Sequence, residues 1–298
     1  MFRTSRRGAF AFILTGILCL VIASFNVGPS VAAESSVLIE AAKRKINLAG
    51  RQRMLSQRIA MQACMAQSGV LVETSLSRGR AAADLFERTM DGLQVGDEEQ
   101  GLSVETHPEV LSALSKVDGL WQSYLASVDA FLDQPGEGPL RMVHARNGAV
   151  LVNMNSAVGV MEGIYGDGLI SPEIAGALNI AGRQRMLIMK ALKEACMITR
   201  GFAAEEDRKA LAKTISLFDT SLYKLRQGNV WDQIIAPPSF EIEMQLELVQ
   251  MIWDWMSPRL EAIADGNSID TDNLRAMAYH GEVALIEMNT AVWLYEAF

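Results

Sequence analysis

Proline, histidine, cysteine and aromatic residues are all scarce in this chain, and their scarcity narrows the classes of fold and site. The 298 residues include 8 prolines, 3 histidines and 3 cysteines, and only 7% are aromatic. Ala, Leu, Met, Glu, Gln and Arg are plentiful instead, which favours helices over sheets. The histidines show no metal-ligand spacing such as HxxxH. The 16 methionines are typical of core filling rather than of copper capture. We therefore expect no metal and no cofactor.

The chain also lacks an excess of positive charge and any signature of catalysis. Its formal net charge is -8, which argues against binding to nucleic acid or to anionic lipid. No nucleophile motif, Gly-rich phosphate loop or paired-carboxylate signature is present, so we do not expect an enzyme. An acidic surface repels small anions at long range, so any anion site here must act through local geometry.

One long hydrophobic run occurs, and it lies at the N-terminus. Arg3, Arg6 and Arg7 precede an apolar stretch over residues 9–25, and small residues follow at 31–33. This pattern predicts a signal peptide over residues 1–33 and a periplasmic location. Its removal would take away three arginines and no acid, leaving 24 Lys and Arg against 35 Asp and Glu. The alternative is an uncleaved inner-membrane anchor, since the run is near the lower length limit for a membrane span.

An internal repeat organises the rest of the chain. Asn47-Leu-Ala-Gly-Arg-Gln-Arg-Met-Leu55 recurs 132 residues later as Asn179-Ile-Ala-Gly-Arg-Gln-Arg-Met-Leu187. The same offset relates Ala63-Cys64-Met65 to Ala195-Cys196-Met197, and Trp121 to Trp253. With two further residues of offset, Met154-Asn155-Ser156 falls on Met288-Asn289-Thr290. The duplication predicts two modules, at residues 36–165 and 172–298.

Each half has the pattern of four helices. We expect them near residues 36–72, 78–95, 107–133 and 139–165, and near residues 172–200, 204–227, 239–264 and 271–297. Short connections rich in Gly, Pro and Asp separate them. The sequence therefore predicts an all-α protein of two tandem up-down four-helix bundle modules related by internal duplication.

The first helix of each half carries one stripe of small and apolar residues that is interrupted by an arginine. In the first half the stripe is Ile46, Gly50, Arg53, Gln57, Ala60 and Cys64, and in the second it is Leu178, Gly182, Arg185, Met189, Leu192 and Cys196. Such a seam should face another helix. If the two seams pack parallel, Arg53 and Arg185 face each other, and a small planar anion between them would accept hydrogen bonds from both guanidinium groups.

Arginines on long helices more often pair with nearby acids or lie over apolar surface. We interpret Arg51, Arg183 and Arg58 in that way, because they lie off the stripe. For Arg53 and Arg185 both interpretations stay open.

Two cysteines lie at equivalent positions on the same stripes. Cys64 and Cys196 each follow the stripe arginine of their half by 11 residues, which is about three helical turns and nearly the same face. Parallel packing would bring them together, and a disulfide could form in an oxidising compartment. The alternative is two small buried hydrophobic residues in equivalent core positions.

The segment Ile46-Asn-Leu-Ala-Gly-Arg-Gln-Arg-Met-Leu-Ser-Gln-Arg58 resembles the opening signature of the PilJ-type domain, the N-terminal sensor of type IV pili methyl-accepting chemotaxis transducers. It is also similar to the sensor domain of NarX-type nitrate/nitrite histidine kinases, whose ligand segment has the form Asn-x-Ala-Gly-x-x-Arg-Met. The NarX-type family binds nitrate there, between symmetry-related helices. By position, the resemblance implies Gly50, Arg53, Gly182 and Arg185 as ligand-binding residues. The second copy departs after Leu187, which implies an asymmetric site.

We therefore expect a periplasmic sensor-type protein that binds nitrate or nitrite and signals through a membrane-bound partner, with a homodimer left open. The alternative is a helical adaptor that docks on a chemotaxis transducer, a pilus component or a sensor kinase. Direct titration of the isolated protein with the anions separates the two hypotheses.

Overall fold

The computed structural model describes residues 31–166, 168–202 and 204–298. The signal peptide predicted for residues 1–33 lies outside these residues, apart from its last three positions. The described residues form α1 (Val31–Gln67), α2 (Val72–Val95), α3 (Pro108–Asp133), α4 (Glu137–Gly166), α5 (Pro172–Arg200), α6 (Ala204–Gln227), α7 (Phe240–Ala264) and α8 (Thr271–Ala297). They contain no strand beyond two isolated bridges. None of these helices combines the length and the apolar character that crossing a membrane requires.

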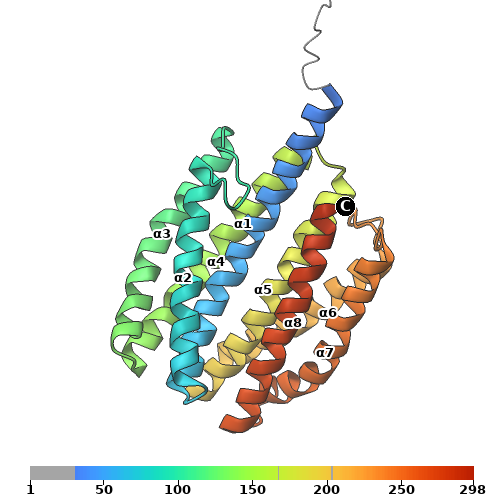
Figure 1. Ribbon diagram of the computed structural model, residues 1–298. Coiled ribbons are helices and arrows are strands. Elements are labelled where there is room, and N and C mark those ends of the chain that lie inside the picture. Colours follow the sequence, from blue (N-terminus) through green and yellow to red (C-terminus); the bar gives the residue numbers. More distant parts are fainter. Residues whose placement is uncertain (1–30, 167, 203) are drawn as a thin grey trace, which may run out of the picture.

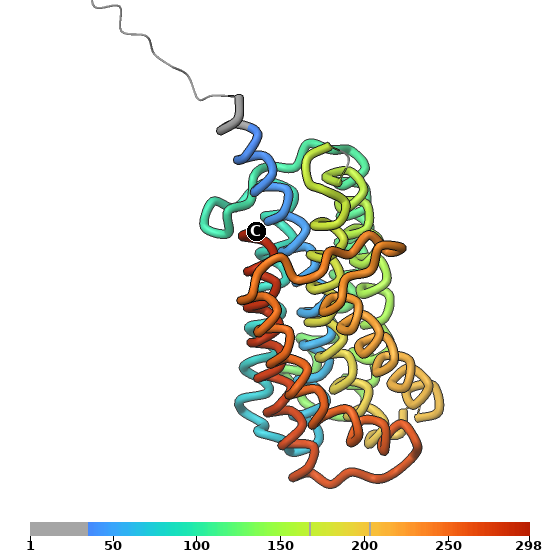
Figure 2. Tube along the Cα trace, turned by 90° about the vertical axis from the view of Figure 1, so that its right-hand side faces the viewer, coloured from blue at the N-terminus to red at the C-terminus, as the bar shows by residue number. Residues whose placement is uncertain are grey.

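The eight helices form two bundle modules, α1–α4 and α5–α8, that pack side by side (Figures 1 and 2). The prediction of an all-α fold of tandem helical modules is confirmed. Helices α1 and α5 lie at the centre and pack against each other. Helix α4 contacts both central helices, and so does α8. The seam between α1 and α5 is thus bordered by α4 and by α8.

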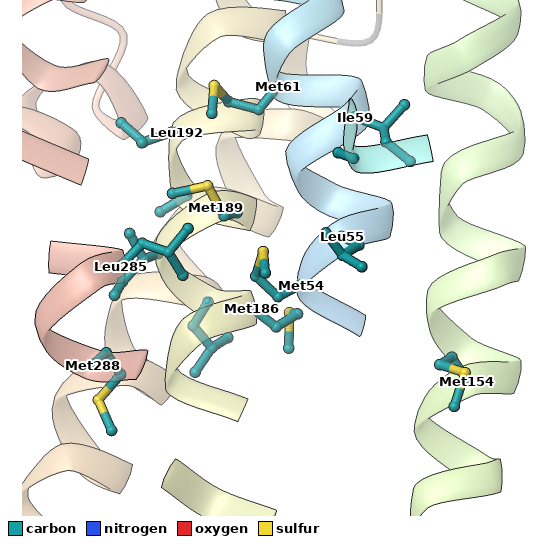
Figure 3. Close-up of a cluster of buried hydrophobic side chains, with 14 of the residues drawn as sticks. Met54, Leu55, Ile59, Met61, Met154, Met186, Met189, Leu192, Leu285 and Met288 are labelled. Carbon is teal, nitrogen blue, oxygen red and sulfur yellow. The ribbon is translucent and has the colours of Figure 1, made fainter. Parts of the chain in front are cut away.

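The repeat is visible in the cores of the two modules. Trp121 stacks on Phe86 with ring centroids 3.9 Å apart, and Trp253 stacks on Phe218 at 3.8 Å. All four side chains are buried. Buried methionines fill the space between the central helices, and Figure 3 shows them among leucine and isoleucine side chains. This packing is the gap-filling role that methionine has in most cores.

The ends of the helices follow local signals, and they differ from the expected bounds at both ends of α1, expected over 36–72, and at the start of α2. Helix α5 starts at an N-cap, where the Ser171 hydroxyl accepts a hydrogen bond from Ile174 N. Helix α1 ends at Gln67 because Gly69 has φ of 75° and Val70 N donates to Met65 O, which closes a Schellman turn. Helix α2 starts at Val72, six residues before its expected start, because this turn leaves almost no loop.

Candidate functional site

The predicted stripes of α1 and α5 form the contact between the two helices. All twelve stripe residues are buried. Near the middle of the contact, a Cβ atom added to Gly50 would lie 3.2 Å from Arg53 Nη2 and 3.6 Å from Arg185 Nη2. A Cβ atom added to Gly182 would lie 3.4 Å and 3.5 Å from the same two atoms. The two guanidinium groups therefore converge on the space between the two glycines.

Oxygen atoms from four asparagines hold the guanidinium groups in place. Arg53 donates from Nη1 to Asn155 Oδ1 at 3.0 Å and from Nη2 to the Asn179 carbonyl at 3.2 Å. Arg185 repeats the pattern on the other side. It donates from Nη1 to Asn289 Oδ1 at 2.9 Å, and from Nη2 to the Asn47 carbonyl at 3.0 Å and to Asn47 Oδ1 at 2.8 Å. Each arginine thus bridges the two modules.

These two cations are buried without a direct carboxylate partner. Arg53 is 1% exposed and Arg185 is 0% exposed, and neither forms an ion pair with any residue that the structure describes. The buried cation Lys45, in contrast, is paired with Glu105 at 2.9 Å. A buried charge without an opposite charge is costly. Two such charges converging on one point form a site that an anion would stabilise.

The pKa values of the two arginines reflect the same cost of burying unpaired charges. Burial, and then the charge of Arg183, lowers the pKa of Arg53 to about 9. Burial, and then the charges of Arg53 and Arg51, lowers the pKa of Arg185 to about 9. Both side chains therefore remain cations at neutral pH, but at an electrostatic cost. A bound anion would favour the charged forms and raise both pKa values.

Two carboxylates contact the asparagines that hold the arginines: Glu296 is buried and Glu162 is half-buried. The side chain of Asn179 donates to Glu162 of α4, and the side chain of Asn47 donates to Glu296 of α8. Both pairs cross between modules, as the arginine contacts do. Each arginine therefore has a chain of contacts through an asparagine to a glutamate, and the negative charges balance the site at a distance rather than in direct contact.

The arginines off the stripe behave differently from each other. Arg58 pairs with Glu282 at 2.6 Å, which fits the ordinary role expected for it. Arg51 donates to Thr89 at 2.9 Å and to Gln100 at 2.6 Å rather than to an acid. Its repeat equivalent, Arg183, has neither a hydrogen bond nor an ion pair within the described part of the chain. Arg51 and Arg183, which occupy the same position of the repeat, therefore differ in their contacts.

Cys64 and Cys196 are joined by a disulfide in the structure, and their Cα atoms are 6.1 Å apart. Both residues are fully buried in the contact between α1 and α5. Arg53 with Arg185 and Cys64 with Cys196 thus form two successive levels of one parallel contact, 11 residues apart on each helix. The disulfide fixes the register of the two helices.

Sequence reasoning did not identify the asparagines and glutamates around the arginines as parts of the site. The missed residues are Asn47, Asn155, Glu162, Asn179, Asn289 and Glu296. The repeat could have indicated them, because each of these residues occurs at the same position in both copies.

Comparison with known proteins agrees with the duplicated architecture. The family model for PilJ, described as "Type IV pili methyl-accepting chemotaxis transducer N-term", matches the chain twice, at residues 39–143 and 171–279. A segment of 129 residues is 33% identical to the methyl-accepting chemotaxis protein McpN of Pseudomonas aeruginosa. That segment covers 43% of this chain and 23% of McpN, so the similarity concerns less than a quarter of the longer protein. The chain belongs to the PilJ family of chemotaxis-transducer sensory domains and carries two copies of that domain.

Proposed function

We propose that this protein is a periplasmic sensor-type binding protein for a small planar anion, nitrate or nitrite, held between Arg53 and Arg185. The observation that carries the proposal is the convergence of two buried guanidinium groups between Gly50 and Gly182, with no carboxylate of a described residue in contact with them. An anion placed there would accept charge-assisted hydrogen bonds from both groups.

The size and shape of the site favour a small planar anion. A single Cβ atom at either glycine would already lie 3.2–3.6 Å from the two Nη2 atoms, so a bulky ligand does not fit between them. A planar oxyanion matches the planar donor fork of arginine, whereas chloride offers no directional acceptors. The resemblance of the Asn-x-Ala-Gly-x-x-Arg-Met segment to that of NarX-type sensors supports nitrate and nitrite in particular.

Isothermal titration calorimetry of the protein tests this proposal. Nitrate, nitrite, sulfate and chloride are titrated separately into the wild-type protein, and we expect saturable heat with nitrate or nitrite at one site per chain. Sulfate is tetrahedral and chloride is spherical, so both should bind more weakly. Absence of saturable heat for all four anions would refute the proposal.

A helical adaptor is the second candidate, and one specific observation favours it. The loop between α6 and α7 exposes Val230 at 90% and Trp231 at 96%. The equivalent positions of the first module hold Glu98 and Glu99. A fully exposed tryptophan beside a valine is typical of a contact with another protein. Such a contact would engage the membrane-bound signalling partner that either function requires. A Trp231→Ala variant that loses the partner but keeps anion affinity would show that the two functions coexist.

A further inference from the structure

The arginine site is closed in the structure, so an anion needs a route to it. Two flanks lead towards it, related by the repeat. The first flank, beside α8, consists of Asn47, Glu296, Arg44, Arg51 and Trp293. The second flank, beside α4, consists of Asn179, Glu162, Gly176, Arg183 and Gly159. Each residue of the second flank occupies the position equivalent to the residue in the same place of the first.

The first flank is closed by large side chains. Arg44 pairs with Glu296 at 2.7 Å and lies over the Trp293 ring at 4.7 Å. Arg51 is bound to Thr89 and Gln100. Two surface hollows of about 640 Å³ and 380 Å³ occur here, and the larger one reaches Glu296, but Asn47 lines neither of them.

The second flank lacks each of these closing elements. Glycines stand in place of Arg44 and Trp293. A Cβ atom added to Gly159 would meet no atom within 4 Å, but one added to the buried Gly176 would lie 3.0 Å from the Gln233 carbonyl oxygen of the α6–α7 loop. Glu162 has no ion pair with a described residue. A cavity of about 320 Å³ lies here, and its lining includes Glu162, Asn179 and Arg183. The cavity therefore reaches the Asn179–Glu162 pair, next to Arg53.

The exposure of the covering asparagines agrees with this difference. Asn155, which accepts from Arg53, is exposed, whereas its equivalent Asn289 is half-buried. Asn155 and Glu162 are seven residues apart and so lie on one face of α4, with Gly159 between them. On this flank Arg53 is thus covered by the exposed Asn155 and by the Asn179–Glu162 pair.

We propose that the anion enters through the second flank, where Arg183 receives it and the Asn179–Glu162 pair forms the inner barrier. This inference rests on the proposed function. Arg183 is suited to the role because its guanidinium group has no hydrogen-bond or ion-pair partner among described residues and lines the cavity. Glu162 and Asp232 also line the cavity, but Asp232 is neutralised by Lys224 at 2.5 Å. The incoming anion would be a small inorganic oxyanion, the class that the inner site binds.

The first test blocks the flank. Gly159→Trp places on α4 the side chain that Trp293 supplies to the other flank. Gly148→Trp is the matched control, since Gly148 is also an exposed α4 glycine with open space around it, 11 residues away on the same face. Exchange of ¹⁵N-nitrate between its free and bound states is measured by NMR, and the dissociation constant by calorimetry. We expect Gly159→Trp to slow association and dissociation by the same factor, with an unchanged dissociation constant, and Gly148→Trp to match the wild type.

The second test removes the receiving charge. Arg183→Gln should slow association by about tenfold at low salt, whereas Arg51→Gln, at the equivalent position of the closed flank, should not. Wild-type rates in both Gly159→Trp and Arg183→Gln, or slow association in Arg51→Gln alone, would overturn the assignment of the entrance while leaving the binding site intact. Absence of nitrate binding to the wild type would instead overturn the proposed function, and the entrance with it.

Discussion

Asn155 of α4 accepts a hydrogen bond from Arg53 of α1 at 3.0 Å, and it is an amide at the position where a carboxylate would neutralise the arginine. An amide oxygen orients the guanidinium group without cancelling its charge. The positive charge therefore remains available to a ligand.

Replacing the Asn155 amide by a carboxylate should neutralise Arg53 and weaken anion binding. In Asn155→Asp, the new carboxylate pairs with Arg53 and competes with the anion, so we expect nitrate affinity to fall by about 1.5–3 kcal/mol. Thermal stability should stay the same or rise. Asn153→Asp is the control, because the Asn153 side chain donates to the Ala149 carbonyl of its own helix. Equal losses of affinity in the two variants, measured by calorimetry, would contradict this role of Asn155.

The shape of the donor group should matter as much as its charge. Arg53→Lys and Arg185→Lys keep the charge but lose the planar fork, so each should weaken nitrate binding by roughly 1–3 kcal/mol with the fold intact. Arg51→Lys should have little effect, since Arg51 is directed to Thr89 and Gln100. The measurement is calorimetric affinity together with circular dichroism. If Arg51→Lys weakened binding as much as Arg53→Lys did, the site would have been assigned to the wrong arginine.

Gly50→Ala should lower nitrate affinity while the protein stays folded. Alanine is favoured over glycine inside a helix by about 1 kcal/mol. Its methyl group, however, would lie 3.2 Å from Arg53 Nη2 and 3.6 Å from Arg185 Nη2, in the space assigned to the anion. We expect a folded protein that binds nitrate weakly or not at all. Gly79→Ala on α2 is the control, where the nearest atoms are side-chain carbons at 3.6 Å and 3.8 Å. Unchanged affinity in Gly50→Ala would place the anion elsewhere.

Nitrate affinity should rise as the pH falls below neutral. Burial raises the pKa of Glu162 and of Glu296 above the ordinary value, against the opposing effects of their asparagine and arginine neighbours. Each carboxyl therefore takes up a proton at a higher pH in the folded than in the unfolded protein. Its contribution to the free energy of unfolding is fully present below the ordinary pKa and is lost as pH rises through the raised value.

The neutral form of either glutamate also removes a negative charge close to the arginines. Titrations of nitrate from neutral pH down to about pH 5 should show this increase in the wild type and a smaller one in Glu162→Gln. A pH-independent affinity in the wild type would show that these carboxylates do not act on the anion.

Reduction of the disulfide should cost stability. The bond joins residues 132 positions apart, so the chain-entropy model assigns it about 5 kcal/mol. We expect urea denaturation of the wild type to shift to lower concentration with reductant. A Cys64→Ala, Cys196→Ala double variant should resemble the reduced protein and not respond to reductant. An identical midpoint for oxidised and reduced wild type would contradict this contribution.

The repeat explains why so much of this architecture could be predicted from sequence. Helical periodicity and the Gly, Pro and Asp residues that end helices are local features, and the two copies support each other. Most predicted helix bounds therefore agree with the structure. The predicted end of α1 and the predicted start of α2 were both wrong because they depend on the Schellman turn at Gly69, which compresses the connection. The stripe predicted that Arg53 and Arg185 face each other, because heptad spacing alone determines which residues share a seam.

The positions of the residues around the arginines depend on tertiary packing between helices. Asn155 and Asn289 reach the site only because α4 and α8 border the α1–α5 seam, and the Asn–Glu pairs exist only because each crosses from one module to the other. No local pattern encodes these contacts. Their repetition in both halves indicated importance but not position.

Covalent continuity of the two modules has a consequence for how the proposed site responds to dilution. A binding site formed between two separate subunits is lost when the subunits dissociate. Its occupancy therefore falls with protein concentration as well as with ligand concentration. Here the chain itself and the Cys64–Cys196 bond hold α1 against α5. Occupancy should then follow the anion concentration alone, even when only a few copies of the protein are present.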